Sequence, residues 1–218
     1  MPKRLSATAR AKKIKLLLFD VDGVLTDGRL FIFPAPSGTE QSVLDRIEKE
    51  KSAQHGGLGG YGLHSPDGKV QSLIEAKGFH AHDGTAISLA RLGGIRTGLI
   101  TKRISETVAL RARDLKLDYV EQGIADKRGC FEKIVALAGL KLDEAAFVGD
   151  DVIDLPAMRS AGLAIAVRNA RTEVKREAHH VTRLGGGEGA LRDAVEFILK
   201  AQGKWKSSVE SYIGERSS

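Results

Sequence analysis

The stretch Ile14-Lys15-Leu16-Leu17-Leu18-Phe19, followed at once by Asp20-Val21-Asp22-Gly23, decides the fold. An almost continuous apolar run of this length is typical of a strand that is buried on both faces of a sheet. Two carboxylates and a glycine end the run, which is typical of a tight turn. We therefore predict a strand over 14–19 with an acidic turn at its carboxyl end.

Outward from this strand, short apolar runs alternate with amphipathic stretches. The apolar runs predict further strands over 95–100, 145–148 and 163–167. The amphipathic stretches predict helices over 85–92, 104–115, 127–138 and 154–160. Strand and helix in alternation indicate an α/β fold, a Rossmann-like parallel sheet with helices on both faces.

Polar side chains stand where three of these strands end. Asp20 follows the first strand, Thr101 the second and Asp150 the third. In open parallel sheets, ligands bind beyond the carboxyl ends of the strands. We therefore expect these three residues to converge on one ligand at one edge of the sheet.

The residue types at this edge favour chemistry on a phosphoryl group. Asp20 and Asp22, two residues apart on a turn, can serve one small volume, one as nucleophile and the other handling protons. Attack of a carboxylate on a phosphate requires the repulsion between anions to be neutralised. Asp150 offers a hard oxygen ligand for Mg²⁺, and Lys127, at the start of a predicted helix, offers an ammonium group. Thr101 adds a hydroxyl group and a strand-end amide.

The same residues form a recognisable series of motifs. Asp20-x-Asp22-Gly-Val, Thr101, Lys127 and the segment GDDVID at 149–154 match, in order, the four motifs of the haloacid dehalogenase-like phosphohydrolases. The chain resembles this superfamily over about residues 14–203, apart from the tip of an insert. The resemblance implies a member of the capless type, with a β-hairpin flap in place of a cap domain.

The resemblance implies catalytic roles for four residues. Asp20 would be the nucleophile that forms an aspartyl-phosphate intermediate. Asp22 would protonate the departing oxygen and then activate water. Thr101 and Lys127 would bind the phosphoryl oxygens.

The resemblance also implies a magnesium site. Its ligands would be the Asp20 side chain, the main-chain carbonyl of Asp22 and Asp150. Asp151 and Asp154 would orient these ligands and Lys127.

A closer resemblance concerns the substrate. The segments FDVDGVLTDG (19–28), GFHAHDG (78–84), ITKR (100–103) and VTRLGGGEGALRD (181–193) are similar to the family of 3-deoxy-D-manno-octulosonate 8-phosphate phosphatases of lipopolysaccharide precursor synthesis. A sugar acid phosphate carries a carboxylate as well as a phosphate, which gives paired arginines a role. The implied substrate contacts are Asp22, Lys127, His80, Ala81, His82, Asp83, Gly84, Arg103 and Arg111.

Two positions depart from that family's pattern. The family often has glycine where Lys102 stands and arginine where His82 stands. These departures concern the substrate contacts and not the chemistry. Three alternatives stay open: a phosphatase for a nine-carbon, sialic-acid-like 9-phosphate, a non-catalytic homologue, and a phosphotransferase. The last usually needs a larger cap to exclude water than this polar insert can form.

The predicted domain organisation has three parts. Residues 1–13 are predicted to be a flexible basic arm, 14–203 the phosphatase domain, and 204–218 a C-terminal tail. The flap insert spans about 29–78, with hairpin arms near 29–33 and 69–76 and a mobile, partly ordered tip. In the family the hairpin docks on neighbouring subunits of a tetramer and the glycine-rich tail closes over a neighbour's site, so we expect a homotetramer here.

Charge and composition narrow the function classes. The net charge of +6 arises from six cations in the first 15 residues, and the remainder holds 28 basic against 28 acidic residues. Nucleic-acid binding needs a basic face on the folded body, so we do not expect it. No apolar run approaches the length of a membrane span. Cys130 is the only cysteine, and we expect a cytoplasmic protein.

Overall fold

The computed structural model describes residues 5–34, 63–64, 70–71 and 73–215. By internal contacts the chain divides into two units, Met1–Arg29 with Gly78–Ser218, and Leu30–Lys77. The larger unit holds a six-stranded parallel sheet. In spatial order its strands are β10 (His180–Val181), β9 (Leu163–Ala166), β8 (Ala145–Gly149), β1 (Leu16–Phe19), β6 (Arg96–Ile100) and β7 (Tyr119–Glu121).

The central strand is the one predicted from the opening sequence. All four residues of β1 are fully buried, between β8 on one side and β6 on the other. Phe19 pairs with Leu99 of β6 and with Val148 of β8. This register brings the residues that follow these three strands to the same edge of the sheet.

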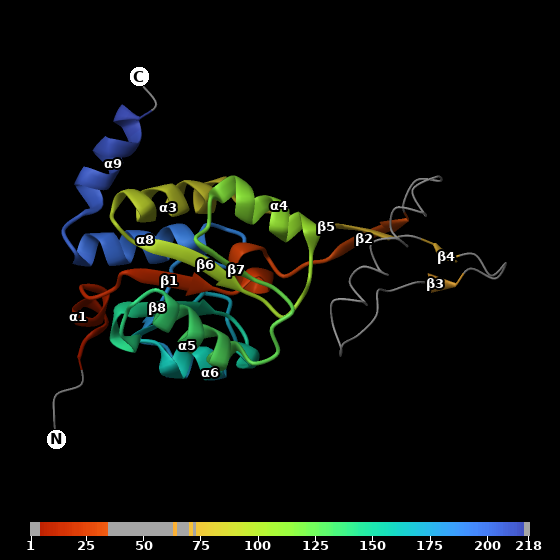
Figure 1. Cartoon of the computed structure of the whole chain (residues 1–218), viewed down its shortest axis with the longest axis horizontal. Helices are drawn as coiled ribbons and strands as arrows, with labels where there is room; N and C mark the ends of the chain where they lie inside the picture. The colour runs from red at the N-terminus through yellow and green to blue at the C-terminus, as the bar shows by residue number, and fades with distance from the viewer. Residues whose placement is uncertain (1–4, 35–62, 65–69, 72, 216–218) are drawn as a thin grey trace. The chain divides into compact units, whose positions relative to one another are not determined.

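Helices cover both faces of the sheet, as predicted. In Figure 1, α3, α4 and α8 lie over one face, and α5 and α6 lie over the other. Among the described residues, the helices of this unit are α1 (Ala7–Ala11), α3 (Ala81–Leu92), α4 (Glu106–Leu115), α5 (Lys127–Leu137), α6 (Leu155–Ser160), α7 (Thr172–Glu177), α8 (Ala190–Ala201) and α9 (Trp205–Gly214). None of the described helices combines the length and the apolar character of a membrane span.

The prediction of a flexible arm over 1–13 is wrong for residues 5–13. Ser6 caps α1 by accepting a hydrogen bond from the amide of Ala9 (3.2 Å), and Ala11 is fully buried. The Arg10 guanidinium donates to the carbonyl of Gly162 at 2.7 Å. The basic residue Arg10 is therefore held against the folded unit. The tail predicted over 204–218 contains a further helix, α9, whose Ser208 is buried.

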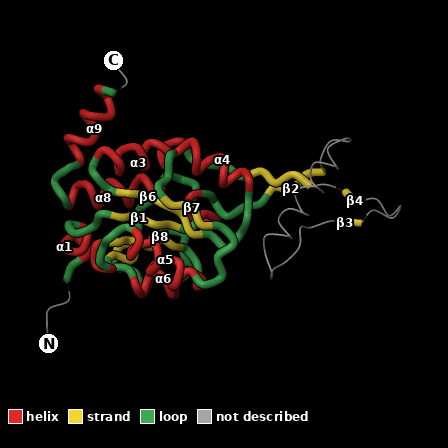
Figure 2. The backbone as a smooth tube through the Cα atoms, in the orientation of Figure 1, coloured by secondary structure: helices red, strands yellow, loops and turns green. Residues whose placement is uncertain are grey.

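The smaller unit contains two short antiparallel strand pairs. Strand β2 (Phe31–Pro34) pairs antiparallel with β5 (Leu73–Ala76), with Phe31 opposite Ala76. A second short pair joins β3 (Leu63–His64) and β4 (Val70–Gln71). Figure 2 shows these strands in yellow. The predicted tip of the flap lies mostly outside the described residues.

Candidate active site

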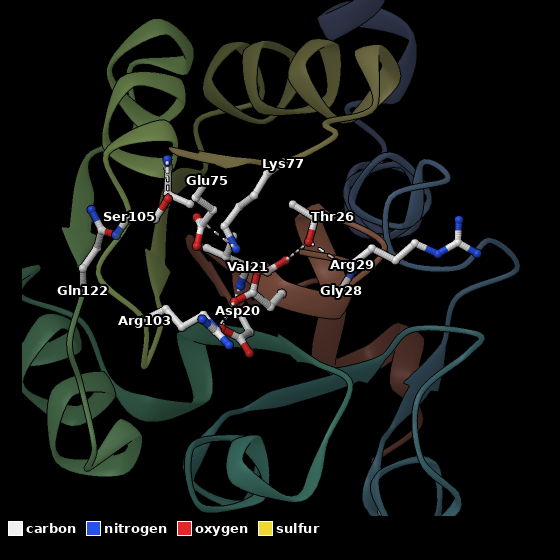
Figure 3. Close-up of polar contacts among 12 residues, drawn as sticks. Asp20, Val21, Thr26, Gly28, Arg29, Glu75, Lys77, Arg103, Ser105 and Gln122 are labelled. Atoms are coloured by element: carbon white, nitrogen blue, oxygen red, sulfur yellow. Dashed lines mark hydrogen bonds and ion pairs between the residues drawn. The ribbon is translucent and has the colours of Figure 1, made fainter. Parts of the chain in front are cut away.

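The loop after β1 is held by its own side chains. Asp20 is almost completely buried, and its Oδ1 accepts a hydrogen bond from the amide of Val21 at 2.7 Å. The Thr26 hydroxyl donates to the carbonyl of Val21 at 3.3 Å and accepts from the amide of Gly28 at 3.2 Å (Figure 3). These bonds close the loop into a compact turn with a fixed shape.

Gly23 allows two parts of the site to approach each other. Its φ of +89° favours glycine, and a Cβ atom built there would lie 2.1 Å from Oδ2 of Asp150. The backbone of the first motif and the carboxylate of the fourth are therefore in direct contact. No other residue type fits this position without moving one of them.

Lys127 links two of the acidic residues. As the first residue of α5 it is 2% exposed, and its Nζ lies 2.8 Å from Oδ2 of Asp20 and 2.7 Å from Oδ1 of Asp154. Burial lowers the pKa of Lys127, but the charges of Asp154 and Asp20 outweigh this effect and raise the pKa above its usual value. Lys127 is therefore a fixed ammonium group beside the proposed nucleophile.

Asp154 contacts three neighbouring groups. Its Oδ2 accepts hydrogen bonds from the amides of Asp150 (3.0 Å) and Asp151 (3.4 Å), while its Oδ1 binds Lys127. A Cβ atom at Gly149 would lie 2.5 Å from the Cβ of Asp154, so glycine is required there too. The side chain of Asp151 has a different partner. Its exposed carboxylate instead accepts from the amide of Val152 at 2.7 Å and caps a 3₁₀ turn.

The acidic residues at this edge fit a divalent cation. Oxygens of Asp20, Asp150 and Asp154 all lie within 4.8 Å of one another. Oδ1 of Asp150 is buried and has no hydrogen-bond partner among the described residues. Burial, and then the charge of Asp154, raises the pKa of Asp20 to about 6 and that of Asp150 to about 7. One lysine does not balance the charge of three carboxylates, so the cluster lacks positive charge. Carboxylates are hard oxygen ligands, which favour Mg²⁺.

The remaining motif residues lie around this cluster. Thr101 is buried at the end of β6, with its amide bonded to the carbonyl of Glu121 at 2.9 Å. Nε of Arg103 lies 3.5 Å from Oδ2 of Asp22, and Figure 3 shows the Arg103 side chain beside the loop. Both of these side chains are partly exposed, at 45% for Arg103 and 24% for Asp22. They can therefore reach a ligand in solution.

The segment predicted to contact substrate is divided in the structure. Nδ1 of His80 accepts from the amide of His82 at 3.3 Å, and the two rings make an edge contact at the start of α3. Neighbouring Ala81 is exposed. Asp83 is fully buried, and its Oδ1 accepts from the amide of Arg192 at 2.9 Å. Burial raises the pKa of Asp83, and the carboxylate serves to cap α8.

Arg111 meets this segment from the neighbouring helix α4. One of its guanidinium nitrogens lies 2.8 Å from the position that a Cβ atom of Gly84 would occupy. The guanidinium also lies 5.7 Å from the centre of the Phe79 ring. Nε of Arg111 is buried and has no hydrogen-bond partner among the described residues. The structure thus brings Arg111 and Gly84 together.

The sequence did not predict the contact made by the glycine-rich segment. We expect the glycine-rich tail to close over a neighbour's site, and within its own chain Gly187 donates to the carbonyl of Val24 at 3.2 Å. A Cβ atom at Gly186 would lie 1.8 Å from the carbonyl oxygen of Gly23. The sequence signal for this contact was the run of three consecutive glycines. Such a run indicates that two backbones approach closely but does not identify the second segment.

The fold and the acidic cluster define a haloacid dehalogenase-like hydrolase. A family model described as haloacid dehalogenase-like hydrolase matches residues 100–189. The 3-deoxy-D-manno-octulosonate 8-phosphate phosphatase KdsC of Escherichia coli K12 is 30% identical over 93% of this chain and 88% of that protein. KdsC of Yersinia pestis is 31% identical over 89% of this chain and 84% of that protein.

A solved structure supports the same assignment. The 3-deoxy-D-manno-octulosonate 8-phosphate phosphatase of Moraxella catarrhalis, in complex with magnesium, phosphate and KDO, is 29% identical with a TM-score of 0.73. The match covers 94% of this chain and 97% of that one. The chain belongs to the haloacid dehalogenase-like family, in the group that includes the KdsC phosphatases, and it is a phosphatase.

Proposed function

We propose that the protein is a Mg²⁺-dependent phosphomonoesterase that hydrolyses 3-deoxy-D-manno-octulosonate 8-phosphate to the free sugar acid and phosphate. The observation that carries the proposal is the buried group of Asp20, Lys127 and Asp154 next to Oδ1 of Asp150, which has no hydrogen-bond partner in the described part of the chain. It combines a nucleophile, a fixed cation and a carboxylate oxygen that can bind Mg²⁺. The names and substrates of the KdsC relatives support the choice of sugar.

Asp20 carries out the first chemical step in this proposal. Its carboxylate oxygen forms a bond to phosphorus while the bond from phosphorus to the sugar oxygen breaks. Lys127 and Thr101 hold phosphoryl oxygens, and Asp22 gives its proton to the departing sugar oxygen. Mg²⁺ bound by Asp20, Asp150 and the main-chain carbonyl of Asp22 would neutralise charge on the phosphoryl group.

Asp22 also serves the second step. Having lost its proton, the carboxylate accepts one from a water molecule, which attacks the aspartyl-phosphate and releases phosphate. The partial exposure of Asp22 suits a group that exchanges protons with a departing alcohol and with water. The burial of Asp20 beside Lys127 strengthens the attraction between its carboxylate and the ammonium group.

Two arginines support an acidic sugar as substrate. Arg103 is half-exposed beside Asp22, and Arg111 has a buried nitrogen without a hydrogen-bond partner among the described residues. A sugar carboxylate can accept hydrogen bonds from a guanidinium group in a paired geometry. His82 and Lys102, where the family often has other residues, are exposed and free to adjust the sugar contacts.

The test measures phosphate release from 3-deoxy-D-manno-octulosonate 8-phosphate and from a sialic-acid-like 9-phosphate, each with Mg²⁺ and with chelator. We expect the higher kcat/KM on the eight-carbon substrate and loss of turnover in chelator. Asp20→Asn should be inactive, whereas Asp27→Asn, an exposed carboxylate of the same loop, should keep wild-type activity. A preference for the nine-carbon compound would favour the second candidate. Wild-type protein inert on both would contradict the proposal.

We also propose a cytoplasmic homotetramer. Strand β2 exposes three large apolar side chains, Phe31 (48%), Ile32 (58%) and Phe33 (51%). Adjacent exposed apolar residues favour a protein–protein interface. Light scattering should give a mass four times that of the 23.4 kDa chain, and Ile32→Asp should lower it. A wild-type mass of one chain would contradict the tetramer.

A further inference from the structure

The glycine loop, residues 184–189, lies in direct backbone contact with the loop that carries Asp20 and Asp22. A Cβ atom at Gly186 would lie 1.8 Å from the carbonyl oxygen of Gly23 and 2.9 Å from that of Thr26. A Cβ atom at Gly187 would lie 2.4 Å from the amide nitrogen of Asp27. No side chain can be placed between these two segments, so they pack backbone to backbone.

Gly23 connects the glycine loop to the metal-ligand candidates. Its carbonyl faces Gly186, and the position of its missing side chain faces the carboxylate of Asp150. The contacts thus run from Gly186 through Gly23 to Asp150. Because close-packed segments transmit displacements, a shift at Gly186 moves the first motif relative to the fourth.

The glycine loop is itself firmly anchored. The side-chain oxygen of Asn169 accepts from the amide of Gly186 at 2.9 Å. Glu188 accepts from the amide of Gly185 at 3.2 Å and from Arg168 at 2.7 Å. The loop therefore has the fixed geometry that a support needs.

We propose that the glycine loop is a positioning element of the phosphatase, which sets the separation between the Asp20–Asp22 backbone and Asp150 within one subunit. This inference rests on the proposed role of Asp20 and is independent of the sugar. Gly186 has no positive φ, so its backbone conformation suits any residue. Glycine is therefore needed at 186 for the close approach itself.

The first test is Gly186→Ala, with Gly214→Ala as matched control because nothing lies within 4 Å of a Cβ atom there. The added methyl group must push the two backbones apart by more than about 1 Å, and a displacement of that size lowers kcat by about 100-fold. The substrate is p-nitrophenyl phosphate, a simple phosphomonoester. We expect kcat to fall with little change in KM, and Gly214→Ala to match wild type.

A second readout does not depend on turnover. Titration calorimetry with MgCl₂ should give a weaker dissociation constant for Gly186→Ala than for wild type and Gly214→Ala. Thermal unfolding controls for stability, with assays kept well below each Tm. Wild-type kcat and wild-type Mg²⁺ affinity in a folded Gly186→Ala protein would overturn the proposal.

A milder pair of variants keeps the proposal testable if Gly186→Ala does not fold. Asn169→Leu removes the acceptor that holds Gly186, and Asn169→Asp keeps an acceptor of the same size. We expect Asn169→Leu to lower kcat and weaken Mg²⁺ binding, and Asn169→Asp to restore part of both. Equal activity in both variants and wild type would count against positioning. If wild type hydrolyses p-nitrophenyl phosphate but not the octulosonate phosphate, only the proposed substrate fails.

Discussion

Two ion pairs at opposite edges of the sheet have similar lengths and very different surroundings. Lys127 and Asp154 lie 2.7 Å apart with side-chain exposures of 2% and 0%. Lys13 and Asp143 lie 3.0 Å apart with exposures of 48% and 53%. Water screens the second pair and cannot reach the first. Burial, and not distance, therefore decides which of these charges can alter the chemistry of a neighbour.

The largest expected effect comes from removing the buried nucleophile. Asp20→Asn should lower kcat by at least about 10³-fold, because the amide cannot form the covalent intermediate. Phosphate release from p-nitrophenyl phosphate measures the loss. The exposed Asp143→Asn is the matched control at the other edge and should keep wild-type kcat. Comparable losses in both variants would contradict the distinction between the edges.

The buried cation should have the next largest effect. Lys127→Met leaves Asp20 and Asp154 without their shared ammonium group, and we expect kcat/KM to fall by about 10²-fold. The free energy of unfolding should fall by about 3 kcal/mol at neutral pH, as for other broken buried pairs. Urea titration measures the stability. Lys133→Met, an exposed position on the same helix, should change neither quantity.

The pKa values of the acidic cluster predict an unusual pH dependence for the metal-free protein. Burial first, and then neighbouring charge, raises the pKa of Asp20 to about 6 and of Asp150 to about 7, so the folded state keeps protons that the unfolded chain loses near pH 4. The resulting stability is present at low pH and is lost as the pH rises toward 7. In chelator, Tm should fall by roughly 5 °C between pH 5 and pH 8.

Added Mg²⁺ sharpens the same measurement. The ion binds the deprotonated carboxylates, so it should raise Tm more at pH 8 than at pH 5. A chelated protein whose Tm rises over this range would show that the cluster does not hold protons as its burial predicts. Asp150→Asn should weaken both the pH dependence and the effect of Mg²⁺.

The smallest effect is expected at the exposed edge. Lys13→Ala removes an ion pair that water already screens, and the free energy of unfolding should change by less than about 1 kcal/mol. Activity should stay at the wild-type level. Urea titration at low and high salt measures the change, and a loss comparable to that of Lys127→Met would contradict the comparison.

Much of the core was predictable because its signals are local. The apolar runs predicted β1, β6, β8 and β9 to within a few residues, and the amphipathic stretches predicted α3 to α6. The strands β7 and β10 were missed because each has only three or two residues and lacks an apolar run. The helix α1 was missed because the burial of Ala11 and the partner of Arg10, Gly162, are set by tertiary packing.

The same distinction between local signals and tertiary packing applies to the site. Asp20 and Asp150 could be brought together from sequence, since parallel strands end at a common edge. Asp83 could not be placed, because its partner amide belongs to Arg192, 109 residues further along the chain. The contact of Gly186 with Gly23 is equally non-local. When two backbones that are distant in sequence approach closely, the sequence shows only a glycine and does not identify the partner.

The division of the larger unit into two chain segments bears on how freely the insert can vary. Its central strand comes from the first 29 residues, and the rest of the sheet begins only after Gly78. Loop-closure entropy grows slowly with length, so doubling the residues inside the hairpin would cost about 0.6 kcal/mol. Pairing of Phe31 with Ala76 closes the insert near its base. Evolution could therefore lengthen or shorten this excursion with little penalty to the sheet that bears Asp20.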